Sequence, residues 1–266
     1  MTTFAAYTQI FLRSTWLQYL ALFQWATLRG YVGYKLILPI TQILFFVELG
    51  VYATGRQNAL YFAIGNAMQI TANAGIFGVI ATVANERQYG TLPMLLASPA
   101  NRLVTFLSRA VVNTIDGISS VIVALALVVV IFGLNLNQAN LPLLGLCVLI
   151  VSMTTAGLGL LFGSIGLVMR DAIVIANVVY YLLLVFCGIN FPVDRLPLAM
   201  QVIAYSLPLT RGVEAARMAA AGASFSDVSG LLAGELTIGV VYAAIGYALF
   251  RWLESRARNG GLQEAY

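Results

Sequence analysis

Polar side chains inside apolar segments are the residues of this chain whose types and spacing point to chemistry. Asn66, Gln69 and Asn73 recur at intervals of three and four residues, so on a helix they form one polar stripe. Amides in hydrocarbon either hydrogen-bond to neighbouring helices or line a hydrated route. The stripe predicts a translocation path at a dimer interface. For any single amide, packing between helices is at least as good an explanation.

Other polar residues in apolar segments extend this prediction. Gln42 and Asn177 are added to the candidates for the path because each is an amide within an apolar run. Glu48, Asp116 and Glu235 are acidic residues in similar surroundings, and the sequence leaves their roles open.

Catalytic and metal-binding chemistry finds little support. The chain has no histidine, and Cys147 and Cys187 both lie in apolar segments, which argues against a metal site or a disulfide. Lys35 is the only lysine and stands outside any Gly-x-x-x-x-Gly-Lys-Ser/Thr loop. We therefore expect no enzyme activity and no cofactor on this chain, with any ATP and Mg²⁺ bound by a partner.

The composition defines the elements that must position these side chains. Hydrophobic residues make up 61% and charged residues 9% of the 266 residues, and the mean hydropathy is +0.90. Apolar runs approach the ~20 residues that cross a bilayer, so the fold class predicted is an all-α membrane protein. The pI near 9.2 reflects membrane orientation rather than nucleic-acid binding, because the basic residues are scattered.

Six transmembrane helices are expected in one domain over residues 31–250. Residues 1–30 mix aromatic and basic residues without a cleavage site, so they predict a retained interfacial amphipathic helix, with part of a tilted first span as the alternative. Residues 251–266 form a charged tail. The predicted spans are 31–53, 60–84, 103–132 with the membrane entered near 112, 143–169, 172–189 and 231–250. In the fourth, Gly159 and Gly163 predict close helix packing.

The distribution of basic residues predicts the orientation. With both termini cytoplasmic, ten of the 14 basic residues lie inside and four outside, in keeping with the retention of positive charge on the cytoplasmic side. The inner set is Arg13, Arg29, Lys35, Arg87, Arg102, Arg109, Arg170, Arg251, Arg256 and Arg258, and the outer set is Arg56, Arg195, Arg211 and Arg217. The expected location is the cell (inner or plasma) membrane.

Residues 85–102 are the most polar interruption of the apolar runs and predict a short cytoplasmic helix. Gly90 suits the left-handed end of one helix, Thr91 suits the cap of the next, and Pro99 stops it. Between these residues, Leu92, Leu95 and Leu96 share one face, so the helix at about 91–98 is amphipathic.

This segment also carries a family resemblance. Its sequence, Glu86-Arg-Gln-Tyr-Gly-Thr-Leu-Pro-Met-Leu-Leu-Ala-Ser-Pro, is similar to a pattern in the first cytoplasmic loop of type-2 ABC exporter permeases. In that family the segment is the coupling helix that seats in the ATPase subunit. The resemblance implies contacts to the ATPase from Glu86, Arg87, Gly90, Thr91, Leu92, Leu95, Leu96 and Pro99.

Residues 191–227 predict a second special element. Prolines at 192, 197 and 208 bracket two helices too short to span, one at 198–206 and another starting at Pro208. An ordinary external loop fits these residues equally well. Their order after the coupling segment, however, resembles the extracellular re-entrant hairpin of the same family.

The prediction is therefore a permease subunit of an ABC exporter. The resemblance implies ABC ATPase subunits and a second permease chain, identical or related, as partners in the lipid bilayer, without nucleic acid. The aromatic-rich spans favour an amphiphilic small molecule, such as a drug or antibiotic, or a lipid as cargo. The alternatives are an ion-gradient-driven secondary transporter, which mid-membrane acids such as Glu48 and Glu235 would suit, and a membrane assembly factor that transports nothing.

Overall fold

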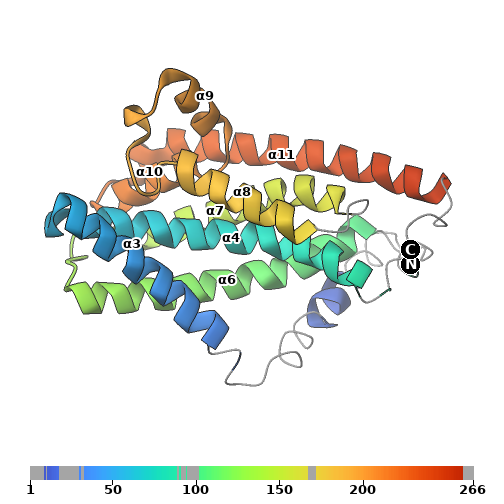
Figure 1. The fold of residues 1–266 in the computed structure, drawn as a ribbon, viewed down its shortest axis with the longest axis horizontal. Helices are drawn as coiled ribbons and strands as arrows, with labels where there is room; N and C mark the ends of the chain where they lie inside the picture. The colour runs from blue at the N-terminus through green and yellow to red at the C-terminus, as the bar shows by residue number, and fades with distance from the viewer. Residues whose placement is uncertain are drawn as a thin grey trace.

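The computed structural model describes residues 9, 11–17, 30, 33–88, 90, 94, 102–166 and 172–259, and these form helices joined by short turns (Figure 1). In chain order the elements are η1 (Gly33–Ile37), α3 (Leu38–Thr54), η2 (Arg56–Asn58), α4 (Ala59–Gln88), α6 (Arg102–Phe132), α7 (Leu141–Ile165), α8 (Ala172–Phe186), η3 (Val193–Arg195), α9 (Leu198–Ser206), α10 (Thr210–Ala220) and α11 (Phe225–Asn259). The all-helical part of the fold prediction is confirmed.

Three described segments are long and apolar enough to cross a membrane. They are Arg56–Thr82, Leu141–Ile165 and Phe225–Leu253. Shorter apolar helices cover Leu38–Thr54, Gly117–Phe132 and Ile173–Phe186. These six segments fall where the sequence predicts its six spans. In the N-terminal region, residues 11–17 are helical, with Leu12 and Trp16 exposed, and most of the predicted interfacial helix lies outside the described residues.

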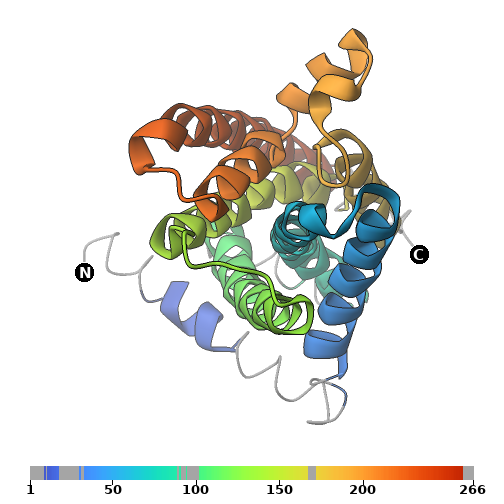
Figure 2. The same ribbon diagram turned by 90° about the vertical axis from the view of Figure 1, so that its left-hand side faces the viewer.

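Helix α4 lies at the centre of the bundle. It contacts α3, α6, α7, α8 and α10, whereas α11 packs against α7 and α10. Figure 2 shows α4 end-on with the other helices arranged around it. One apolar core joins α4, α7, α8, α10 and α11, and a second joins α3, α4 and α6. The stripe of amides on α4 is therefore carried by the most enclosed helix described.

Glycines allow α7 to approach its neighbours closely. A Cβ on Gly159 would lie 2.9 Å from the carbonyl oxygen of Ile76, so the α4 backbone occupies the space of a side chain. Where α7 contacts α11, a Cβ on Gly246 of α11 would lie 2.7 Å from the backbone nitrogen of Leu161 of α7. The packing role predicted for Gly159 is confirmed, and Gly163 makes only ordinary van der Waals contact with Ile80.

Several helix boundaries differ from the prediction, among them the end of α11, which continues to Asn259. Helix α11 begins at Phe225, six residues before the expected start, because the Ser224 backbone N–H and Oγ both donate to Asp227 Oδ2, at 2.8 and 2.7 Å. Asp227 thereby caps the N-terminus of the helix, which starts ahead of its apolar run. Helix α10 begins at Thr210 rather than at Pro208. Helix α9 has the predicted bounds.

The predicted coupling helix lies almost entirely outside the described residues. Gly90 has φ of 67°, the left-handed conformation expected at a helix end, and Met94 is exposed. Glu86 and Arg87 belong to the last turn of α4, and their side chains are not described. Thr91, Leu92, Leu95, Leu96 and Pro99 are outside the described residues.

The close approach of α4 and α7 predicts opposite responses at two glycines of α7. Gly159→Ala should cost about 1–3 kcal/mol, because the added methyl group meets the α4 backbone. Gly145 has no atom within 4 Å of its Cβ position, so Gly145→Ala should be neutral or stabilising by about 1 kcal/mol. Thermal unfolding in detergent, followed by size-exclusion chromatography, measures both. Equal shifts in the two variants would contradict the close approach.

Candidate functional site

Tyr180 of α8 is the point where three helices share polar contacts. Gln42 of α3 donates from Nε2 to the Tyr180 hydroxyl at 2.7 Å. Gln69 of α4 donates from Nε2 to the Tyr180 carbonyl oxygen at 3.1 Å. Gln69 is completely buried, whereas Gln42 is half-buried. Two of the predicted path residues, far apart in sequence, are thus brought together through one tyrosine.

Asn66 occupies the turn of α4 before Gln69 and reaches a different segment. Its Nδ2 donates to the Phe62 carbonyl within α4 and to Oδ1 of Asn190, both at 3.0 Å. Asn66 is fully buried, and Asn190 lies in the bend that follows α8. Asn190 was not among the predicted path residues. Its signal in the sequence is a lone amide directly before the proline-containing hairpin.

The α4 amides keep acceptor oxygens that their contacts do not use. In the described part of the chain, Asn66 Oδ1, Gln69 Oε1 and Asn73 Oδ1 are buried without a hydrogen-bond donor. A buried polar group without a partner costs about 1–3 kcal/mol. We call these three residues the amide row. It offers three acceptors, on successive turns of the central helix, to water or to a hydrogen-bond donor on a ligand.

Asn177 is separated from the amide row. It lies on the exposed side of α8 and donates from Nδ2 to the Ile173 carbonyl at 3.0 Å, within its own helix. It is one turn from Tyr180 but makes no contact with the other predicted path residues in the described structure. A route that used both Asn177 and the amide row would pass around α8.

Glu235 of α11, whose role the sequence left open, is fully buried and caps α10. Its Oε1 accepts hydrogen bonds from the Leu209 backbone N–H at 2.5 Å and from the Thr154 hydroxyl at 3.0 Å. Its Oε2 accepts one from the Gly212 N–H at 3.1 Å. A carboxylate at a helix N-terminus is stabilised by the free N–H groups and by the helix dipole.

Arg217 anchors the other half of α10. Its guanidinium donates to the carbonyl oxygens of Gly188 at 2.8 Å, Ile189 at 2.7 Å and Tyr61 at 3.3 Å. It also stacks on the Tyr61 ring, 3.4 Å from the centroid. Arg217 therefore connects α10 to the start of α4 and to the bend after α8, beside the segment that holds Asn190. The charge count had placed it only as an outer basic residue.

An all-helical bundle with apolar spans and buried amides defines a helical membrane protein. Comparison with protein families matches residues 8–220 to the ABC-2 type transporter family. Because the match covers more than half of the 266 residues, the chain belongs to the ABC-2 type transporter family. This confirms the family predicted from residues 86–99. Comparison with curated proteins finds no match.

Membership of this family establishes the general role of the chain. It is a multi-pass membrane permease domain, of a type that is typically non-catalytic and works with a separate ABC ATPase subunit. ATP and Mg²⁺ are used by that partner in this family.

The hydrogen bonds of the amide row predict that its members differ in structural importance. Asn66→Leu removes a donor shared between α4 and the bend after α8, and leaves Asn190 Oδ1 without it, so the expected cost is about 1–3 kcal/mol. Asn73 makes no hydrogen bond in the described structure, so Asn73→Leu should be neutral or stabilising. Thermal unfolding of both variants in detergent tests this. A larger loss for Asn73→Leu would show that its amide has a structural partner.

The buried cap predicts that Glu235→Gln loosens the first turn of α10. The glutamine retains one acceptor but turns an N–H group toward a backbone N–H, so the expected loss is about 1–3 kcal/mol. Hydrogen–deuterium exchange should rise in the peptide that starts α10. Glu214→Gln, an exposed glutamate on the same helix, is the matched control and should change nothing. Equal exchange in all three proteins would argue against the cap.

Proposed function

We propose that this chain is the permease subunit of an ABC exporter that moves an amphiphilic small molecule or a lipid out of the cytoplasm. The observation that carries the proposal is the family match over residues 8–220, and the amide row supports it. Three buried acceptors on the central helix give a polar cargo group or water a place to bind inside an apolar bundle. ATP hydrolysis on a separate chain drives the movement.

The proposed path uses Gln42, Asn66, Gln69 and Asn73, with Asn177 facing the second permease chain. The first four lie on or beside α4, and three of them contact α8 or the bend after it. Asn177 is exposed among apolar residues of α8, where a second copy or a related permease would cover it. Helix α8 carries both the contacts to the path residues and the exposed side with Asn177. A movement of α8 would therefore open or close access to the amide row.

The proposed orientation places residues 86–99 and both termini on the cytoplasmic side and the α9–α10 hairpin outside. In Figure 1 the ends of α4 and α6 that flank residues 86–99 lie at the opposite end of the bundle from α9. The hairpin carries three of the four basic residues assigned to the outside. An ATPase docked on residues 86–99 would act on α4 directly, since this helix continues to Gln88.

The geometry of Glu235 favours this proposal over an ion-gradient-driven transporter. A coupling carboxylate must exchange its ion or proton during transport. Glu235 instead uses both oxygens to hold α10, through two backbone N–H groups and a threonine hydroxyl. These hydrogen bonds give Glu235 a structural role. If the carboxylate gave them up to bind an ion or a proton, α10 would lose its N-terminal cap.

The decisive experiment removes the apolar face of the proposed coupling helix. Leu95→Asp combined with Leu96→Asp should weaken docking of the ATPase by a hundredfold or more, because each buried leucine contributes about 1.5–3 kcal/mol. The measurement is the yield of the ABC ATPase that copurifies with the chain in mild detergent, together with permease-dependent ATP hydrolysis. Membrane insertion should be unchanged, because the segment does not cross the bilayer.

The matched control places the same charges at the other end of the bundle. Leu198 and Val202 of α9 are exposed, at 79% and 72%, so Leu198→Asp with Val202→Asp should leave ATPase association intact. Normal copurification and coupled hydrolysis with the Leu95/Leu96 double variant would remove the coupling role and the exporter proposal with it.

A further inference from the structure

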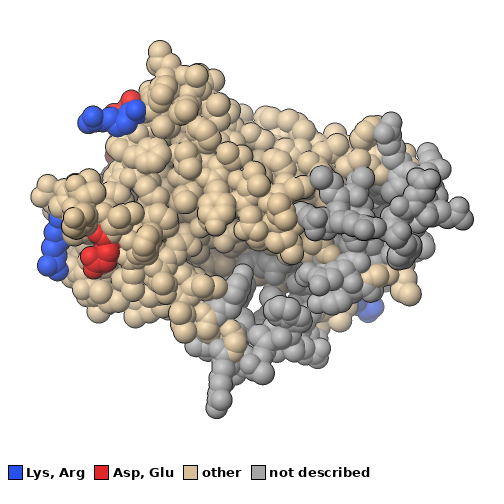
Figure 3. Space-filling view, in the orientation of Figure 1, with Lys and Arg blue, Asp and Glu red and all other residues tan. Residues whose placement is uncertain are grey.

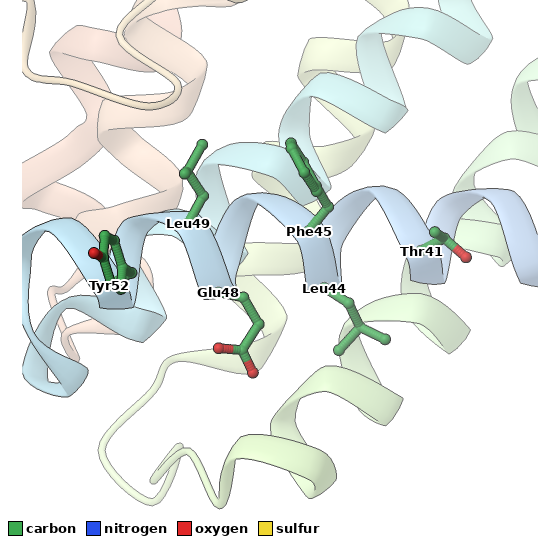
Figure 4. A pocket seen from close by; sticks show the side chains of 6 residues that line it. All are labelled: Thr41, Leu44, Phe45, Glu48, Leu49 and Tyr52. Atoms are coloured by element: carbon green, nitrogen blue, oxygen red, sulfur yellow. The ribbon is translucent and has the colours of Figure 1, made fainter.

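A groove along the exposed face of α3 is a feature that the proposed path does not use. It is lined by Thr41, Leu44, Phe45, Glu48, Leu49 and Tyr52 and has a volume of about 570 Å³. The residues recur every three to four positions, so they form a single helix face. Figure 4 shows Glu48 and Leu44 on one margin of this face, Phe45 and Leu49 on the other, and Tyr52 toward the end that leads into η2.

Glu48 is a charged group in surroundings that otherwise suit lipid. Phe45 is 60% and Leu49 52% exposed, and Glu48 is exposed beside them. In the described structure its carboxylate has no hydrogen-bond or ion-pair partner. Glu48 lies six residues before the end of α3, or about 9 Å along the helix, which is within the hydrocarbon if α3 spans. A lipid-facing carboxylate at that depth is unfavourable, and a cation beside it would stabilise it.

The described helices do not supply that cation. Glu48 is the only charged residue of α3, and α8, whose exposed face bears Asn177, has none. Arg56, in the next turn of the chain, directs its Nη2 toward the Phe132 carbonyl at 3.5 Å. On the face shown in Figure 3 most of the described surface is uncharged. No basic side chain among the described residues pairs with Glu48, so the proposal takes the counter-charge from another molecule.

The side chains of the groove indicate which kind of molecule could supply the positive charge. A second copy related by a two-fold axis through this face would bring one Glu48 toward the other, and like charges repel. Aliphatic and aromatic side chains around the carboxylate favour a cation with an apolar body. Phe45 is one turn before and Tyr52 one turn after Glu48, and aromatic rings attract organic cations.

We propose that the α3 groove binds a lipophilic organic cation, with Glu48 pairing with its charge. This inference rests on the proposed exporter function, since it names the chemical class of the cargo. The apolar body of the cation replaces lipid against Leu44, Phe45 and Leu49, and its positive charge acts as the counter-ion of Glu48. The groove offers the cargo a first site at the periphery of the bundle, where Glu48 lies about 9 Å along α3 from Gln42.

The test compares two probes of the same shape and opposite charge. The full chain in nanodiscs of zwitterionic lipid should bind tetraphenylphosphonium saturably and should discriminate against tetraphenylborate. Glu48→Gln should weaken tetraphenylphosphonium binding at least tenfold, and Glu48→Asp should restore most of it. Glu214→Gln removes an exposed carboxylate from α10 and should leave binding unchanged.

Three results would overturn the proposal: no saturable binding of tetraphenylphosphonium, equal binding by wild type and Glu48→Gln, or equal binding of both probes. A change of oligomeric state in Glu48→Gln, without cation binding in the wild type, would make the groove an interface between permease chains. Copurification of the ATPase is measured on the same preparations. If the wild-type chain copurifies with the ATPase but does not bind the cation, only the proposed cargo class is wrong. If the wild-type chain does not copurify with the ATPase, the exporter proposal is wrong.

Discussion

The carboxylate of Glu235 at the N-terminus of α10 is the contact on which the arrangement of the hairpin and the central helix depends. Backbone N–H groups within a bilayer need partners inside the protein, and a short helix that ends inside the bundle exposes several of them. Leu209, the residue directly before α10, has φ of 103°, a conformation that is costly for a residue other than glycine. The hydrogen bonds from Leu209 and Gly212 to Glu235 hold this turn in place.

Arg217, a basic residue near the C-terminus of α10, fixes the other end of this helix. The acid lies at the positive end of the α10 dipole, and the base lies toward the negative end, so both charges are favourable to the helix. Through carbonyls of Tyr61, Gly188 and Ile189, Arg217 also holds the bend after α8 against the start of α4. That bend carries Asn190, the partner of Asn66. The position of one end of the amide row therefore depends on two residues outside it, the buried Glu235 and the half-buried Arg217.

This arrangement separates two polar environments. The amide row is enclosed on the central helix, where its free acceptors suit hydrogen-bond donors. The α3 groove is open and places the Glu48 carboxyl group among apolar side chains, which is the chemistry of the proposed site for a cation with an apolar body. Gln42 and Glu48 both belong to α3, so a shift of that helix would move the groove and the contact to Tyr180 together.

The sequence by itself determined the membrane class, the family, the helical composition and the approximate position of each apolar helix, because these follow from hydrophobic runs, proline and glycine positions and a local motif. It also marked Gln42, Asn66, Gln69 and Asn73 as polar groups needing a partner. Only the tertiary structure decided the partners of Gln42, Asn66 and Gln69, since Tyr180 and Asn190 lie more than 100 residues away from them. Asn73 Oδ1 has no partner among the described residues. The same reason explains Glu235 and Glu48, two acids in similar apolar stretches. Three donors from α7 and the start of α10 surround Glu235, whereas no donor from the described residues reaches Glu48. Local sequence records the charge of a residue, but the packing of distant helices determines whether that charge is neutralised.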